Sequence, residues 1–247
     1  MKLERFQRSD DVAARAADLV AEVLAREPAP VLLLPAGRTP EPLYRELVLR
    51  HRARELDLGR ARLFQLDELV GVGSADPRSF QRFLIENLIA PADLELDERV
   101  RLLDGRASDP ATEIARHAQA LEALGGAHLA LVGIGTNGHV AFNEPGSARG
   151  ARARPVDLAA TTRAGLARTF HAGEVPTRGI TLGLLEILGA RELVLLATGE
   201  GKAEVLRRLA TRPPSDELPA SHLCAHRSFR VLADEAACGL LDQTSPA

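Results

Sequence analysis

The side chains best suited to chemistry stand together in residues 131–147, whose sequence is LVGIGTNGHVAFNEPGS. His139 can exchange a proton near neutral pH without a large shift of its pKa. Asn137 and Glu144 are suited to orienting an imidazole or to holding the hydroxyl groups of a polyol. The glycines between them let the backbone bend and approach a ligand closely. Taken alone, this pattern fits a catalytic loop and a glycine-rich loop with an exposed histidine equally well.

Two other stretches have an arrangement that binds anions, in which a strand ends in a glycine turn that opens a helix. The apolar run 31–34 is followed by PAGRTP, where Thr39 suits an N-cap and Pro40 a first helical position. The apolar run 192–197 is followed by TGEGK, which ends at Lys202. Free backbone N–H groups and the positive end of the helix dipole favour an anion there. The residues alone also allow plain strand-to-helix connections and a solvated lysine.

A pair of carboxylates follows a third apolar run. Residues 62–66 predict a strand, and Asp67 and Glu68 come directly after it. Open α/β sheets place their ligands beyond the carboxyl ends of the strands. Adjacent residues of an extended chain point to opposite sides, so only one of these two carboxylates can face such a ligand. A turn aspartate beside a solvated glutamate is the simpler alternative.

The elements that must position these residues alternate between strand and helix. Short apolar runs predict strands at 31–34, 62–66, 129–132, 192–197 and 229–232. Helical spacing and caps predict helices at 11–26 after Asp10, at 79–88, and at 109–124 after Asp109 or Ser108, where Gly125 and Gly126 end the helix. Residues 179–188 are also expected to be helical. The chain is therefore expected to form one α/β domain over residues 1–247, with a Rossmann-like, open, mostly parallel sheet and helices on both faces.

Composition restricts the class of protein. The 247 residues are 45% hydrophobic and 26% charged, as in ordinary globular domains. A net charge of −3 argues against a nucleic-acid-binding surface. No apolar run approaches the ~20 residues of a membrane span, and the first residues lack the apolar core of a signal peptide. Cys224 and Cys238 fit neither a metal-ligand spacing nor a disulfide framework, so we expect no metal and a reduced, cytoplasmic setting.

The stretch GIGTNGHVAFNEPGS, residues 133–147, resembles the signature of glucosamine-6-phosphate deaminases, whose superfamily includes the 6-phosphogluconolactonases. The resemblance runs from about residue 30 to 236. Residues 35–40 are similar to the family's Gly-Gly-Thr-Pro phosphate turn, and residues 67–71 to its Asp-Glu-Tyr-Val-Gly segment. The resemblance implies conversion of glucosamine 6-phosphate and water into fructose 6-phosphate and ammonium. It implies no cofactor and only a small amino sugar phosphate as partner.

The resemblance also gives each candidate residue a role. Asp67 becomes the base that moves the C2 proton toward C1, and His139 the proton shuttle that opens the pyranose, steered by Asn137 and Glu144. The substrate phosphate is expected to be bound by Gly37, Arg38, Thr39, Arg168 and Lys202. Arg168 lies in residues 147–176, which are rich in arginine and poor in large apolar side chains. Such a segment packs weakly, and the resemblance makes it a mobile lid over the sugar.

Three residues depart from the family pattern. Arg38 replaces the second glycine of the phosphate turn, where its side chain either crowds the turn or adds a guanidinium to the phosphate site. Leu69 replaces a tyrosine. Asn137 stands where many relatives have aspartate, and an amide cannot stabilise a charged imidazole as a carboxylate does. Glu144 is therefore expected to carry more of that role.

Two other functions remain open at this stage. A 6-phosphogluconolactonase would share the fold and the Gly-His pair, but it would not need the triplet Phe142–Asn143–Glu144. A non-catalytic sugar-phosphate sensor would not need Asp67, His139 and Glu144 together. The sequence leaves open whether glucosamine or galactosamine 6-phosphate is preferred and whether the chain forms a homo-oligomer. Some relatives are hexamers with an allosteric activator, which we do not expect for a chain that ends soon after Leu241.

Overall fold

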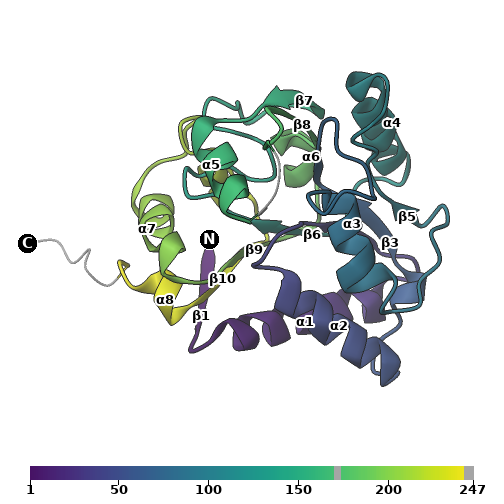
Figure 1. The fold of residues 1–247 in the computed structure, drawn as a ribbon. Coiled ribbons are helices and arrows are strands. Elements are labelled where there is room, and N and C mark those ends of the chain that lie inside the picture. The colour runs from purple at the N-terminus through teal and green to yellow at the C-terminus, as the bar shows by residue number, and fades with distance from the viewer. Residues whose placement is uncertain (170–173, 242–247) are drawn as a thin grey trace, which may run out of the picture.

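The computed structural model describes residues 1–169 and 174–241 (Figure 1). The strands are β1 (Lys2–Phe6), β2 (Val31–Leu34), β3 (Arg62–Gln65), β4 (Asp67–Leu69), β5 (Val100–Arg101), β6 (Leu129–Gly133), β7 (Arg154–Asp157), β8 (Arg178–Thr181), β9 (Glu192–Ala197) and β10 (Phe229–Asp234). The α-helices are α1 (Ser9–Arg26), α2 (Glu41–Arg52), α3 (Phe80–Leu84), α4 (Pro110–Ala123), α5 (Ala160–Thr169), α6 (Leu184–Leu188), α7 (Ala203–Thr211) and α8 (Glu235–Cys238). Shorter helical segments are η1 (Leu58–Arg60), η2 (Ile85–Ile89), η3 (Glu200–Lys202) and η4 (Pro219–Ala225).

In the described part of the chain, seven strands form one sheet in the order β1-β10-β9-β6-β2-β3-β5, and every neighbouring pair is parallel. From β2 the chain builds outward through β3 and β5. It then returns to β6, on the other side of β2, and builds outward through β9 and β10. The strand order therefore reverses between β2 and β6, which is where open α/β sheets bind their ligands.

Both faces of the sheet are covered by helices, as the near-continuous apolar strands predicted. Side chains alternate along β2, so Val31 and Leu33 enter one core while Leu32 and Leu34 enter the other. The first core includes residues of α4, α6 and α7, and the second includes residues of α1 and α2. In Figure 1, α1 and α2 lie beneath the sheet, while α4 and α6 lie above it. The predicted Rossmann-like α/β architecture is confirmed.

A second, small sheet was not expected from the sequence. It has the antiparallel order β4-β8-β7. The chain enters it directly from β3, because the N–H of Leu66 donates to Leu34 in the main sheet while its carbonyl accepts from Leu182 beyond β8. This crossing turns Asp67 out of the parallel sheet and places it at the start of β4.

The small sheet also corrects the helix predicted at 179–188. Residues Arg178–Thr181 form β8, and the helix there is only α6, which begins after Gly183. Ile180 and Thr181 are β-branched, and they pair with both β4 and β7. The carbon of a side chain at Gly179 would lie 2.5 Å from the ring of Phe142, so this strand packs closely against the signature loop.

Two predicted helix caps are wrong. Helix α1 begins at Ser9, so its N-cap residue is Arg8, two positions before the predicted cap Asp10. Helix α2 begins at Glu41, and Thr39 does not cap it. Pro40 occupies the N-cap position with an already helical backbone, and no side chain caps it. Thr39 is thereby left within the turn that precedes the helix.

The predicted ends of α4 are confirmed. The Asp109 carboxylate accepts a hydrogen bond of 2.9 Å from the N–H of Ala111, and Pro110 is the first helical residue. Gly125, just after the helix, has a φ of 79°, which a residue with a side chain rarely adopts. Both signals are local, which explains why the sequence revealed them.

Candidate active site

A cavity of about 670 Å³ lies at the reversal of strand order. The segments that follow β2, β3, β6 and β9 line it, and residues next to or within α3 and α5 complete its walls. Eight of the nine residues singled out from the sequence line this one cavity: Gly37, Arg38, Thr39, Asp67, Asn137, His139, Arg168 and Lys202. Glu144 lies behind the wall, where it contacts Asn137 and His139.

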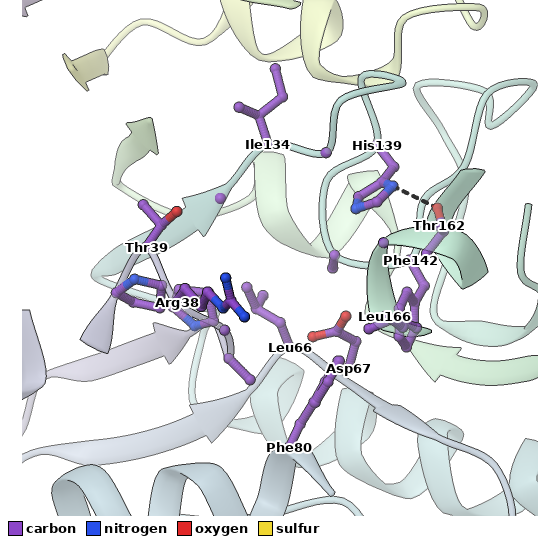
Figure 2. Close-up of a pocket in the computed structure, with 18 of the residues that line it drawn as sticks. Arg38, Thr39, Leu66, Asp67, Phe80, Ile134, His139, Phe142, Thr162 and Leu166 are labelled. Atoms are coloured by element: carbon purple, nitrogen blue, oxygen red, sulfur yellow. Dashed lines mark hydrogen bonds between the residues drawn. The ribbon is translucent and has the colours of Figure 1, made fainter. Parts of the chain in front are cut away.

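The turn after β2 supplies one wall of the cavity. Gly37 has a φ of 118°, in the region that favours glycine, so the backbone turns sharply between Leu34 and α2. The side chain of Arg38 is exposed, and Thr39 is half-buried beside it. Figure 2 shows Arg38 and Thr39 on the opposite side of the cavity from His139. The turn thus brings a guanidinium and a hydroxyl to the wall of the cavity, groups that can bind an anion.

Lys202 reaches the same cavity from the turn after β9. Its ammonium donates a hydrogen bond of 2.6 Å to the carbonyl of Ile134, and an ammonium carries three donors, so two N–H groups remain for a ligand. Burial lowers the pKa of Lys202 below its usual value. The turn itself is held by Asp234, whose two carboxylate oxygens each lie 3.0 Å from the N–H of Gly199.

His139 is held against the backbone of the loop. Its carbonyl accepts a hydrogen bond of 2.9 Å from the N–H of Gly135. A Cβ at Gly135 would lie 2.3–2.5 Å from three atoms of the imidazole, so only glycine allows the ring to sit there. The ring nitrogen Nδ1 lies 3.0 Å from the hydroxyl of Thr162 and 3.4 Å from Oε2 of Glu144. The imidazole therefore has polar partners on its Nδ1 side.

Asn137 contacts the backbone of His139 and the side chain of Glu144, and not the imidazole itself. Its amide donates to Oε2 of Glu144 at 2.9 Å and to the hydroxyl of Thr161 at 3.0 Å, and its carbonyl oxygen accepts from the N–H of His139 at 3.1 Å. Burial by itself raises the pKa of Glu144, but hydrogen bonds with His139, Thr162 and Asn137 bring that pKa below its usual value. Glu144 is therefore an anion close to the imidazole.

Asp67 and Glu68 are both buried but differ in their surroundings. Glu68 accepts hydrogen bonds from the N–H groups of Leu69, Phe80 and Gln81 and from the hydroxyl of Ser79. Asp67 lines the cavity, and within the described part of the chain no hydrogen bond reaches its carboxylate. Burial and the neighbouring charge of Glu68 raise the pKa of Asp67 well above its usual value. The two side chains thus point to different sides, as adjacent residues of an extended chain must.

Part of the wall near Asp67 is apolar. The rings of Phe80 and Phe142 have centroids 5.6 Å apart, and Leu166 of α5 packs in the same cluster. Figure 2 shows Phe80, Phe142 and Leu166 close to Asp67. These side chains give the Asp67 carboxyl apolar neighbours along this part of the cavity wall.

Sequence reasoning missed several residues of the cavity, among them Ser79, Thr161, Thr162 and Leu166. Ser79 and Phe80 lay in a segment that resembles the family, but nothing local marked them as wall residues. Thr161 and Thr162 belong to an unremarkable Ala-Thr-Thr sequence, and only the docking of α5 onto the loop brings them to His139 and Asn137.

The segment predicted as a lid, residues 147–176, contains β7 and α5, and residues 170–173 lie outside the described residues. Arg154 ties β7 to the signature loop, with hydrogen bonds of 2.9 Å to the hydroxyl of Ser147 and 3.0 Å to the side chain of Asn143. Arg168, Leu166 and Thr162 of α5 all line the cavity. The position of α5 agrees with a segment that covers the cavity, and the mobility of this segment stays a prediction.

Two further searches concern the described residues only. They contain no cluster of three His, Cys, Asp or Glu side chains that could hold a metal ion. None of their helices combines the length and the apolar composition needed to cross a membrane.

Comparison with known proteins adds an independent line of observation. A family described as glucosamine-6-phosphate isomerases/6-phosphogluconolactonase matches residues 4–232. A protein of Rhodopirellula baltica named glucosamine-6-phosphate deaminase is 39% identical over 244 residues, which cover 98% of this chain and 97% of that protein.

Solved structures agree with this match. A protein described as a monomeric glucosamine-6-phosphate deaminase superposes with a TM-score of 0.94 at 34% identity, covering 97% of this chain and all of the other. A 6-phosphogluconolactonase from Trypanosoma cruzi has a TM-score of 0.79 at 18% identity, covering 97% of this chain and 96% of the other, which shows a common fold only.

Proposed function

The chain belongs to the family of glucosamine-6-phosphate isomerases and 6-phosphogluconolactonases, and from this premise we propose that it is a glucosamine-6-phosphate deaminase. It converts glucosamine 6-phosphate and water into fructose 6-phosphate and ammonium. The observation that carries the proposal is the single cavity in which a proton-exchanging imidazole, a buried carboxylate and several cations meet.

The cationic turns bind the phosphate group. Gly37, Arg38 and Thr39 approach from β2, while Lys202 approaches from β9 and Arg168 from α5. Charge-assisted hydrogen bonds of this kind contribute roughly 1.5–3 kcal/mol each. Anchoring the phosphate fixes the distance from the sugar carbons to the rest of the cavity, which is the main purpose of a non-reacting group in a substrate.

His139 opens the pyranose ring. The imidazole takes the proton of the C1 hydroxyl and returns a proton to the ring oxygen as the C1–O bond breaks, which leaves an aldehyde at C1. The nearby Glu144 anion stabilises the imidazolium that exists between these two transfers. Asn137 keeps Glu144 in place through its amide.

Asp67 then moves a proton from C2 to C1. Removal of the C2 proton, with a proton delivered to the C1 oxygen, forms a C1–C2 enolic double bond. Return of a proton to C1, with loss of one N–H proton from the amine, leaves an imine at C2. Water hydrolyses this imine to the ketone and releases ammonium. The raised pKa of Asp67 suits a group that must accept and return a proton.

The proposal is tested by supplying glucosamine 6-phosphate to the purified protein and measuring ammonium and fructose 6-phosphate. Galactosamine 6-phosphate and 6-phosphogluconolactone are run in parallel, because the sequence left the sugar open and the superfamily includes lactonases. We expect release of ammonium from the glucosamine substrate and little hydrolysis of the lactone. Lactone hydrolysis without ammonium release would show that the protein is a lactonase, and binding without turnover would show that it is a sensor.

We further propose a cytoplasmic setting and a small amino sugar phosphate as the substrate. The number of subunits is open from the sequence, and sedimentation velocity decides between a monomer and a homo-oligomer. A monomer would agree with the structural relative that is described as monomeric.

A further inference from the structure

We infer that Thr162, on helix α5, is a positioning residue for His139: its hydroxyl holds the Nδ1 side of the imidazole and leaves Nε2 for the substrate. Figure 2 shows this contact as a dashed line between the ring and the hydroxyl. The inference rests on the proposed role of His139 as the proton shuttle.

The burial of Thr162 is unusual for its helix. Only 6% of its surface is exposed, whereas its neighbours Thr161 and Arg163 are exposed. Its hydroxyl lies 3.0 Å from Nδ1 of His139, which is closer than the 3.4 Å between Nδ1 and the Glu144 carboxylate. The nearest polar partner of the imidazole is therefore a residue of α5 and not of the signature loop.

The contacts at Nδ1 define the state of the imidazole. An ionised carboxylate can only accept a hydrogen bond, and Oε2 of Glu144 lies 3.4 Å from Nδ1, which favours a proton on that nitrogen. The Thr162 oxygen, 3.0 Å from Nδ1, then accepts from Nδ1–H, which leaves Nε2 of the neutral ring without a proton. An unprotonated Nε2 can take the proton of the C1 hydroxyl, as ring opening requires.

Two other contacts join the start of α5 to the same group. Thr161 accepts from the Asn137 amide at 3.0 Å, and the N–H of Ala159 donates to Oε1 of Glu144 at 3.2 Å. Helix α5 also carries Arg168, which lines the phosphate end of the cavity. One helix therefore connects phosphate binding with the orientation of the imidazole.

The test replaces Thr162 by valine, which keeps the branched shape but removes the hydroxyl, and by serine, which keeps the hydroxyl. Thr162→Ala provides a second variant without a hydroxyl. Thr211→Val is the matched control, because it removes a threonine hydroxyl from α7, far from the cavity lining. Ring 15N NMR spectra report the tautomer of His139, whose signals are identified by their loss in His139→Gln.

We expect neutral His139 of the parent, of Thr162→Ser and of Thr211→Val to carry its proton on Nδ1. In Thr162→Val and Thr162→Ala the population shifts toward the Nε2–H form. An unchanged tautomer in both variants would overturn the inference. Because this measurement needs no turnover, a parent protein with the expected tautomer but no ammonium release would refute the proposed function and not the positioning role.

Kinetics give the second readout. We expect kcat for glucosamine 6-phosphate to fall roughly tenfold or more in Thr162→Val, within the range of general acid–base effects, with KM nearly unchanged. Thr162→Ser should restore most of the lost rate. A valine variant as fast as the parent would contradict the inference.

Discussion

At the scale of single residues, the neighbouring carboxylates Asp67 and Glu68 show how surroundings assign a role. Glu68 is saturated with donors from β4 and the start of α3, so it fixes a wall of the cavity. Asp67 faces the cavity with a raised pKa and apolar neighbours. Burial raises the pKa of both carboxyls, but the oxygens of Glu68 are occupied by donors, so the surroundings favour Asp67 as the proposed base.

Asp67→Asn keeps the shape of the side chain and removes its basicity. We expect the variant to bind glucosamine 6-phosphate but to lose ammonium release and C2 exchange by about 10²–10⁴-fold. Glu68→Gln is the control: it should lose roughly 1–3 kcal/mol of stability, because an amide cannot accept from all these donors, yet keep C2 exchange. NMR in deuterated water follows the exchange. Rapid exchange in Asp67→Asn would contradict the assignment.

The raised pKa of Asp67 also predicts a pH dependence of stability. A carboxyl whose pKa is higher in the folded than in the unfolded state favours folding while it is protonated, and this contribution is lost as the pH rises through the folded pKa. Asp67→Asn should therefore be more stable than the parent at alkaline pH, and the difference should shrink as the pH falls. Urea unfolding at several pH values measures it. A constant difference across pH would exclude a raised pKa.

Lys202 and Arg168, the cations proposed to bind the phosphate, give a third prediction. Lys202→Ala and Arg168→Ala should each weaken binding of the sugar phosphate by about 1.5–3 kcal/mol, or ~10–150-fold, with little loss of stability. Arg163→Ala is the control, since Arg163 is exposed on the same helix as Arg168 but does not line the cavity. Calorimetry with fructose 6-phosphate measures affinity. Equal affinities in all three variants would contradict the proposal that Lys202 and Arg168 bind the phosphate group.

At the scale of elements, the turns that line the cavity are held by hydrogen bonds from neighbouring strands. Asp234, at the end of β10, accepts from the N–H of Gly199 and caps α8 through the N–H of Ala237 at 2.8 Å. Because β10 pairs with β9, this one carboxylate fixes the turn that carries Lys202.

Asp234→Ala should therefore both destabilise the folded protein and weaken substrate binding. We expect a loss of roughly 1–3 kcal/mol in the free energy of unfolding, together with a raised KM for the phosphorylated substrate. Asp109→Ala removes a comparable cap from α4, away from the cavity, and should cost about 1 kcal/mol with no change in KM. If both variants changed KM alike, the effect would come from stability and not from the turn.

At the scale of the whole molecule, the reversal of strand order gathers segments from both halves of the chain. The turns after β2 and β3 come from the first half, and those after β6 and β9 from the second. Beneath them, His117 of α4 packs edge-on against Phe64 and contacts the carbonyl of Gln65 through Nε2 at 2.9 Å. This contact joins the core to the strand that leads to Asp67.

Burial lowers the pKa of His117 to about 4. The unfolded chain takes up this proton below about pH 6.5, and the folded protein does so only near pH 4. Stability should therefore fall between these pH values, with a contribution from His117 on the order of 3 kcal/mol. His117→Gln, which cannot titrate, should show a flatter loss of stability over this range. Equal slopes in parent and variant would contradict the assignment.

Much of the site was predictable because its signals are local. The apolar runs of β2, β6 and β9, the Asp109 cap and the residues of the signature loop all act within a few positions of the chain. Strand ends and the rule for open sheets then placed Asp67, His139 and Lys202 at one edge. The strand β8 was misjudged as helix, because its partners β4 and β7 are distant in sequence and no local period records them.

Only the tertiary structure decided which groups touch. It placed Thr162 on His139, Phe80 against Phe142, and Glu68 under the start of α3 while Asp67 faces the cavity. The two residues of each contact lie far apart in the sequence, so no local sequence pattern shows that they meet. They form when the packing of α3 and α5 brings them within hydrogen-bond or van der Waals distance, and that packing depends on the whole chain.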